Sequence, residues 1–272
     1  MLEDQDDLHA RAWRALMSPV PADKAAFTRQ LFDDWIAGRV PVPDASLCPV
    51  LAVDDPGRPV RPELIAHTSV VRRKPGSPEG RSALLHAIAH IEFNAINLAL
   101  DAAWRFDGMP REFYLDWLRV AAEEAYHFTL LHDHLQTLGY AYGDFPAHDN
   151  LWQMCEKTSD DIVARMALVP RTLEARGLDA TPLIQDKLRN VNTPNALRAV
   201  DILDIILRDE IGHVAIGNHW YRWLCVRDGL DPVAQYGVLV ERYQAPRLHP
   251  PFNEKARKRA GFSDEELAWL LG

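Results

Sequence analysis

Four long stretches with apolar residues at helical spacing fill the region from residue 81 to residue 228. This region shows little of the apolar–polar alternation that marks strands, so the pattern predicts an all-α fold. Glycine and proline breaks bound the four predicted helices, which cover residues 82–106, 111–138, 151–176 and 194–227. We expect these helices to form a four-helix bundle, with Ser82 capping the first helix.

The lengths of the connections indicate how the predicted helices are joined. The breaks after the first and third helices are modest, and residues 177–193 between the third and fourth are expected to hold a short extra helix. The loop at 139–150 is longer, and a loop of this length reaches up to ~40 Å when extended. The pattern therefore favours two antiparallel hairpins joined by one long crossover.

The flanking segments have a different character from the bundle region. Residues 1–39 predict two amphipathic helices separated by the Ser-Pro-Val-Pro segment at 18–21, and residues 38–80 are rich in proline and predict an ordered wrap or linker. After the fourth helix, residues 232–243 predict one more helix, followed by a tail. The expected domains are residues 1–80, 81–228 and 229–272.

Composition excludes several classes of protein. Cys48, Cys155 and Cys225 are odd in number and far apart, so they predict neither disulfides nor a zinc knuckle. A net charge of −9 opposes broad attachment to nucleic acid. The chain starts without a secretory pattern, and no uninterrupted apolar run approaches the roughly 18 residues of a membrane span. We therefore expect a soluble, cytoplasmic protein.

One carboxylate stands out in the first predicted helix. From residue 83 to residue 100, every side chain is apolar, histidine or asparagine except Glu92. A buried carboxylate is costly unless it meets a cation, a hydrogen-bond donor or a metal. This pattern marks Glu92 as a candidate metal ligand.

The second and fourth predicted helices each carry a Glu-x-x-His pair, a spacing that puts both side chains on one helix face. The third predicted helix adds one glutamate at position 174, so each hairpin offers one glutamate and one such pair. Carboxylates with one imidazole per metal suit iron or manganese. The predicted ligands are Glu92, Glu124, His127, Glu174, Glu210 and His213, with no catalytic residue beyond them.

These segments carry a family resemblance. Ala-His-Ile-Glu at 89–92, Glu-Glu-Ala-Tyr-His at 123–127, Leu-Glu-Ala-Arg-Gly at 173–177 and Asp-Glu-Ile-Gly-His-Val at 209–214 resemble an uncharacterised bacterial ferritin-like family. More distantly they resemble the di-iron tRNA hydroxylase that acts on isopentenylated adenosine. The resemblance implies a ferritin-like four-helix bundle holding two iron ions, with Fe/Mn and Mn/Mn pairs left open. Pro170 predicts a kink, or a helix end, close to Glu174.

Residues beside the predicted ligands have two readings. Glu123 and Asp209 directly precede ligand glutamates, and they either hold the ligand imidazoles in place or face solvent. His90 and Tyr126 are also expected beside the metals. His86 and His90 lie one helical turn apart and could bind metal themselves, or they could be buried histidines with hydrogen-bond partners.

The leading hypothesis for function is a di-iron oxidoreductase, a hydroxylase or monooxygenase that uses dioxygen, an external electron donor and an unidentified organic substrate. One alternative is a ferritin-like protein that only binds and oxidises iron. Another is a scaffold without metal, its glutamates paired with Arg165 or Arg171. The basic residues at 255–259, within the tail at 246–262, are expected near the substrate entrance and would suit an anionic substrate. A tRNA substrate and a homo-oligomer are left open.

Overall fold

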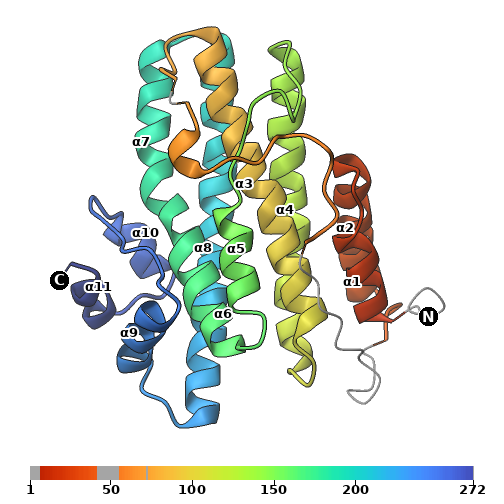
Figure 1. The fold of residues 1–272 in the computed structure, drawn as a ribbon, viewed down its shortest axis with the longest axis vertical. Helices are drawn as coiled ribbons and strands as arrows, with labels where there is room; N and C mark the ends of the chain where they lie inside the picture. Colours follow the sequence, from red (N-terminus) through yellow and green to blue (C-terminus); the bar gives the residue numbers. More distant parts are fainter. Residues whose placement is uncertain (1–6, 42–54, 72, 272) are drawn as a thin grey trace. The chain divides into compact units, whose positions relative to one another are not determined.

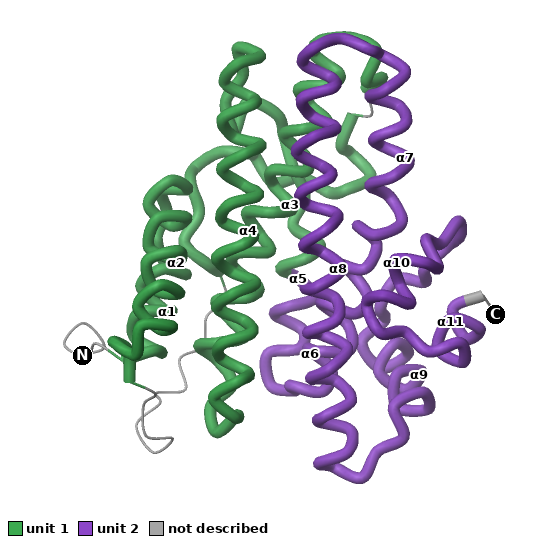
Figure 2. The backbone as a smooth tube through the Cα atoms, turned by 180° about the vertical axis from the view of Figure 1, so that it is seen from behind, with its two compact units in different colours: residues 1–152 green, residues 153–272 purple. Residues whose placement is uncertain are grey.

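The computed structural model describes residues 7–41, 55–71 and 73–271. Within these residues every regular element is helical apart from one isolated β-bridge, which confirms the all-α prediction. The chain forms two compact units, residues 1–152 and residues 153–272 (Figure 2). The three-part division at residues 80 and 228 was drawn from sequence character, and it stays a prediction.

Unit 1 is built on a hairpin of α3 (Pro78–Arg105) and α4 (Arg111–Thr137), and the N-terminal helices pack on this hairpin (Figure 1). Helix α1 (Leu8–Leu16) packs on α3, and α2 (Pro21–Ile36) packs on α4. The two predicted N-terminal helices and their break are therefore confirmed.

Helix α3 begins earlier than the sequence suggested. Its N-cap is Ser77, whose Oγ accepts a hydrogen bond of 3.0 Å from the backbone of Gly80, and Pro78 occupies the first turn. Ser82 lies inside the helix and donates to the carbonyl of Pro78. The prediction of Ser82 as the cap is therefore wrong, because a proline in the first turn is compatible with a helix and extends this one.

Helix α3 is long and apolar enough to cross a membrane by the measure of length and composition alone. In the structure, however, 78% of its most apolar window is buried within the protein. Burial of this kind is expected of a core helix in a soluble protein. The cytoplasmic location stays a prediction.

The proline-rich segment is described only in part, since residues 42–54, including Cys48, lie outside the described residues. Its later part pairs with the loop after α4. The backbone N–H of Ile65 donates to Ala147, and that of Ala147 donates to Glu63, at 2.8 and 2.9 Å. This part of the segment is therefore hydrogen-bonded to the loop after α4 within unit 1.

The third predicted helix, 151–176, is wrong as a single element. The structure has α5 (Asn150–Lys157), α6 (Ile162–Leu168), a π-helical turn η3 (Val169–Glu174) and α7 (Ala175–Val191). Pro170 lacks the N–H that an α-helix needs, and the chain widens into the π-turn at this point. The expected short helix at 177–193 is the body of α7.

Helix α8 (Pro194–Asp228) matches the fourth predicted helix closely. The Thr193 side chain caps its first turn, and Gly229 ends it with a φ of +68°, which favours glycine. Helix α8 forms a hairpin with α7. The prediction that this hairpin and the α3–α4 hairpin build one ferritin-like bundle stays a prediction.

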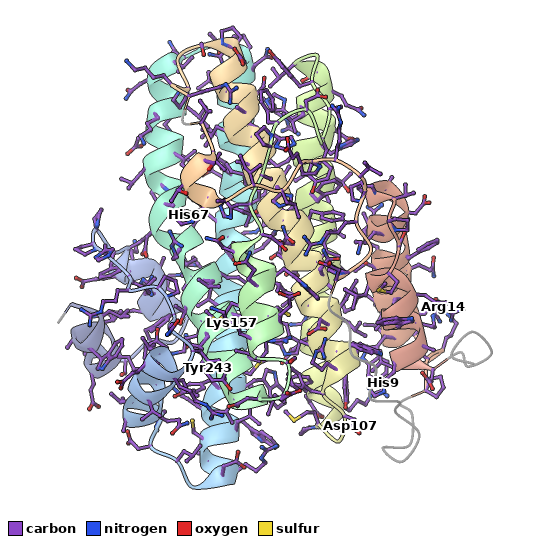
Figure 3. All side chains as sticks on the ribbon, viewed as in Figure 1. His9, Arg14, His67, Asp107, Lys157 and Tyr243 are labelled. Atoms are coloured by element: carbon purple, nitrogen blue, oxygen red, sulfur yellow. The ribbon has the colours of Figure 1, made fainter. Side chains whose placement is uncertain are left out.

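Three short helices complete unit 2: α9 (Pro232–Arg242), α10 (Glu254–Arg259) and α11 (Asp264–Leu271). The expected helix at 232–243 is confirmed by α9. Tyr243, labelled in Figure 3, directly follows α9 and donates a hydrogen bond of 3.0 Å to Asp161, the N-cap residue of α6. This bond anchors the end of α9 to the start of α6.

The basic cluster at 255–259 is not all available to a ligand. Arg257 is fully buried and donates to Asp179 of α7 at 2.6 and 3.1 Å. Lys258 pairs with Asp264 at 2.7 Å. The expectation that all these cations face an anionic substrate is therefore wrong for Arg257, because a buried guanidinium needs a carboxylate partner.

Candidate metal centre

Unit 1 brings three of the predicted ligands together. Glu92 of α3 and Glu124 and His127 of α4 are buried, with exposures of 3%, 0% and 0%. Nδ1 of His127 lies 3.4 Å from Oε2 of Glu124 and 3.2 Å from Oε2 of Glu92. Two carboxylate oxygens therefore converge on one ring nitrogen inside the hairpin.

The electrostatics of this cluster favour a bound cation. Burial, followed by the charge of Glu124, raises the pKa of Glu92 to about 8, against the opposing effect of His127. A neutral imidazole has one N–H, so Nδ1 cannot satisfy both carboxylates. Oε2 of Glu92 accepts no hydrogen bond among the described residues. A divalent metal would neutralise this repulsion and use the same oxygen and nitrogen atoms as ligands.

Unit 2 supplies the other three predicted ligands. Glu210 and His213 of α8 are buried, with exposures of 8% and 1%, and Nδ1 of His213 lies 3.9 Å from Oε1 of Glu210. Glu174 is the last residue of η3 and is 9% exposed. The Glu-x-x-His spacing thus gives a neighbouring carboxylate and imidazole in each unit.

Burial and chemistry together single out the residues that could hold a metal ion. All of them are buried, and each offers one ligand atom. They are Glu92, Glu124, His127 and Glu210. His213 and Glu174 complete the set of ligands predicted from the sequence, and their assignment stays a prediction.

The histidines of α3 are engaged elsewhere. His90 contacts the Tyr142 hydroxyl at 2.8 Å and the carbonyl of His148 at 3.2 Å, and burial lowers its pKa to about 3. His86 accepts a hydrogen bond of 2.8 Å from the backbone of Gly143, and burial lowers its pKa to about 4. Both histidines thus anchor the loop after α4 to α3.

The residues expected to support the ligands differ in their surroundings. Asp209 accepts two hydrogen bonds from Arg208, at 2.8 and 3.0 Å. Glu123 is half-buried on α4. Tyr126 is 42% exposed, and its ring lies 6.4 Å from that of His127. Their roles beside a metal stay predictions.

One residue that packs beside the unit 1 ligands was not predicted from the sequence. Tyr142 comes from the loop after α4 and stacks on His86, with ring centroids 5.4 Å apart. It also packs on Phe93 and Phe128, the residues that directly follow Glu92 and His127. A loop residue has no periodicity that could reveal such a contact, although its position between glycines was visible.

Fold and site together define a class of all-helical protein with buried carboxylates and imidazoles that could hold a metal ion. The chain belongs to the family described as "Protein of unknown function (DUF455)", whose model matches residues 17–268. It is 47% identical over 264 residues to a protein of Haemophilus influenzae described as "Uncharacterized protein", covering 94% of this chain and 91% of that relative. No solved structure matches the chain.

Proposed function

We propose that this protein is a carboxylate-bridged non-haem di-iron oxidoreductase that activates dioxygen to oxidise an organic substrate. The observation that carries the proposal is the convergence of Glu92 and Glu124 on Nδ1 of His127, fully inside the α3–α4 hairpin. The same Glu-x-x-His spacing recurs on α8 as Glu210 and His213.

In this proposal, each of the two hairpins supplies glutamate and histidine ligands. Glu92, Glu124 and His127 come from unit 1, and a second glutamate with a second Glu-x-x-His pair comes from unit 2. This composition of four glutamates and two histidines suits two iron or manganese ions. When bound, two ferrous ions would supply the electrons that reduce dioxygen.

The chain's own residues have three tasks. The carboxylates of Glu92 and Glu124 would supply part of the negative charge that two divalent ions require, and their burial keeps water from competing for the ligand positions. The imidazole of His127 would bind a metal ion as a neutral donor, so Nδ1 must carry no proton when a metal binds there. The apolar side chains of α3 around Glu92 surround the site and limit the access of solvent.

A pairing of the buried glutamates with arginine, as in a scaffold without metal, is less well supported. Arg171 donates to Asn218 and pairs with Glu266, not with a predicted ligand. Arg165 donates to Thr158 and to the carbonyl of Cys155. Both guanidiniums therefore have structural partners of their own.

Metal content and ferrous oxidation test the proposal directly. Protein purified from iron-supplemented cells should hold two iron ions per chain, and the metal-free protein should speed the oxygen-dependent oxidation of added ferrous iron. Glu124→Ala and Glu210→Ala should each lower this rate to background and leave far-UV circular dichroism unchanged, since apolar faces carry the packing.

Matched controls come from the same two helices. Glu112 of α4 and Asp201 of α8 are exposed, so Glu112→Ala and Asp201→Ala should retain both iron and oxidation. Absence of stoichiometric metal from the unsubstituted protein would refute the proposal. So would full oxidation by both ligand variants.

A further inference from the structure

The π-helical turn η3, which ends at Glu174, is held by contacts from three other helices of unit 2. On α8, Gly217 has no side chain, and a Cβ there would lie 2.6 Å from Cβ of Pro170. On α9, the Tyr236 hydroxyl lies 2.8 Å from that of Thr172, which itself donates to the carbonyl of Ala167. These contacts fit the unusual backbone of the turn closely.

The third contact runs through Arg171, which is 2% exposed. Its guanidinium donates to Oδ1 of Asn218 at 3.0 Å and pairs with Oε1 of Glu266, on α11, at 2.9 Å. It also lies 4.9 to 5.0 Å from the ring centroids of three aromatic side chains, those of Tyr221, Tyr236 and Phe262. The three rings and the carboxylate of Glu266 together hold the guanidinium in a single position.

Glu266 is itself fixed from both ends. Its Oε2 accepts from the backbone of Ser263 at 2.7 Å and from Arg222 at 2.6 Å, and the side chain is 4% exposed. Burial alone raises the pKa of Glu266, but the charge of Arg171, the backbone hydrogen bond from Ser263 and the charge of Arg222 together outweigh this effect and lower it. The carboxylate is therefore ionised and held when it meets Arg171.

We infer that Glu266 of α11, acting through Arg171, is a positioning residue that fixes η3 and thereby places the carboxylate of Glu174 as a metal ligand. This inference rests on the proposed function, because it treats Glu174 as a ligand. It assigns the C-terminal helix α11 a task at the metal centre without any contact to the metal.

Helix geometry explains why such a support is needed. A π-turn holds one residue more than an α-turn, and each residue of an α-helix turns the chain by roughly 100°. Relaxation of η3 to the α register would therefore rotate Glu174 relative to α6 by about that angle. Arg171 lies one turn before Glu174, so a fixed Arg171 opposes this rotation.

The test compares Glu266→Gln with Glu265→Gln in the full chain. Glu265 is the exposed neighbour of Glu266 on the same helix, and its replacement removes the same charge. Ferrous iron is titrated under anaerobic conditions by equilibrium dialysis, and thermal unfolding of the metal-free protein is recorded alongside. Glu266→Gln should raise the Kd of the weaker bound iron roughly ten- to a hundred-fold, the range typical when a support of a metal ligand is lost. Glu265→Gln should leave this Kd unchanged.

A double-substitution cycle with Glu174→Gln separates positioning from general loosening of the fold. If Glu266 acts through Glu174, then adding Glu266→Gln to Glu174→Gln should cost less than about twofold further in iron affinity. If the two substitutions instead weaken iron binding independently, so that their fold-changes in Kd multiply, the inference is overturned. Glu266→Asp keeps the charge and should restore much of the iron affinity. Its Kd therefore tests the inference even if Glu266→Gln folds poorly.

The outcomes separate this inference from the proposed function. Unsubstituted protein that binds no iron would refute the proposed function and the inference with it. Unsubstituted protein that binds iron, together with equal iron affinities for Glu266→Gln and Glu265→Gln, would overturn the inference alone.

Discussion

Replacing Gly217 by alanine tests how tightly α8 packs against the π-turn. The added Cβ would lie 2.6 and 2.7 Å from two carbons of Pro170, whereas carbon atoms in contact normally lie about 3.5 to 4.0 Å apart. Overpacking of this kind costs about 1–3 kcal/mol. Alanine gains about 0.8–1.0 kcal/mol over glycine in a helix interior, so we expect a net loss of about 1 kcal/mol.

Gly212 provides a matched control on the same helix, since a Cβ there would meet nothing within 4 Å. Gly212→Ala should therefore keep the helix gain of about 1 kcal/mol without the clash. The two variants should differ by the overpacking cost, which corresponds to a Tm difference of roughly 2–4 °C per kcal/mol. Thermal unfolding of metal-free protein, followed by circular dichroism, measures this difference. If Gly217→Ala stabilised the protein as much as Gly212→Ala, the close packing of η3 on α8 would be refuted.

Three further predictions concern the titration of Glu92, the N-cap of α3 and the buried ion pair of Arg257. Between about pH 5 and pH 8, folded metal-free protein holds a proton on Glu92 that the unfolded chain has lost, so its stability should fall as pH rises. Glu92→Gln should flatten this dependence in thermal melts. Ser77→Ala should cost about 1 kcal/mol in chemical denaturation, and Ser82→Ala clearly less, because only Ser77 caps α3. Asp179→Ala should cost on the order of 3–5 kcal/mol in the same assay, since it leaves the buried Arg257 without its carboxylate. An unchanged denaturation midpoint would contradict that assignment.

The parts of the fold that follow from local sequence were predicted well. Helix α8 begins after Thr193 and ends before Gly229, and both signals are legible in the sequence because capping and left-handed turns are local chemistry. The convergence of Glu92, Glu124 and His127 was predicted for a similar reason. Helical spacing puts these residues on facing sides of two neighbouring helices.

Helix α7 shows why other parts could not be predicted. Pro182 lies inside it and has no N–H to donate to the carbonyl of Leu178. In the structure, the side-chain amide of Asn253 donates to this carbonyl at 3.1 Å. A partner so distant in sequence gives no local signal. The π-turn at Pro170 depends in the same way on Gly217 and Arg171, whose contacts arise only in the folded unit.

The contacts of the tail also impose an order on folding during synthesis. The α3–α4 hairpin and the helices that cover it lie within residues 1–152, so unit 1 can fold while residues 153–272 are still being made. Unit 2 has no such freedom, because Leu178 receives its donor from Asn253 and Arg171 its carboxylate from Glu266. Until those later residues leave the ribosome, the carbonyl of Leu178 and the guanidinium of Arg171 lack the partners that they have in the folded unit. The α6–α7 segment therefore reaches its final packing only after residue 266 has been made.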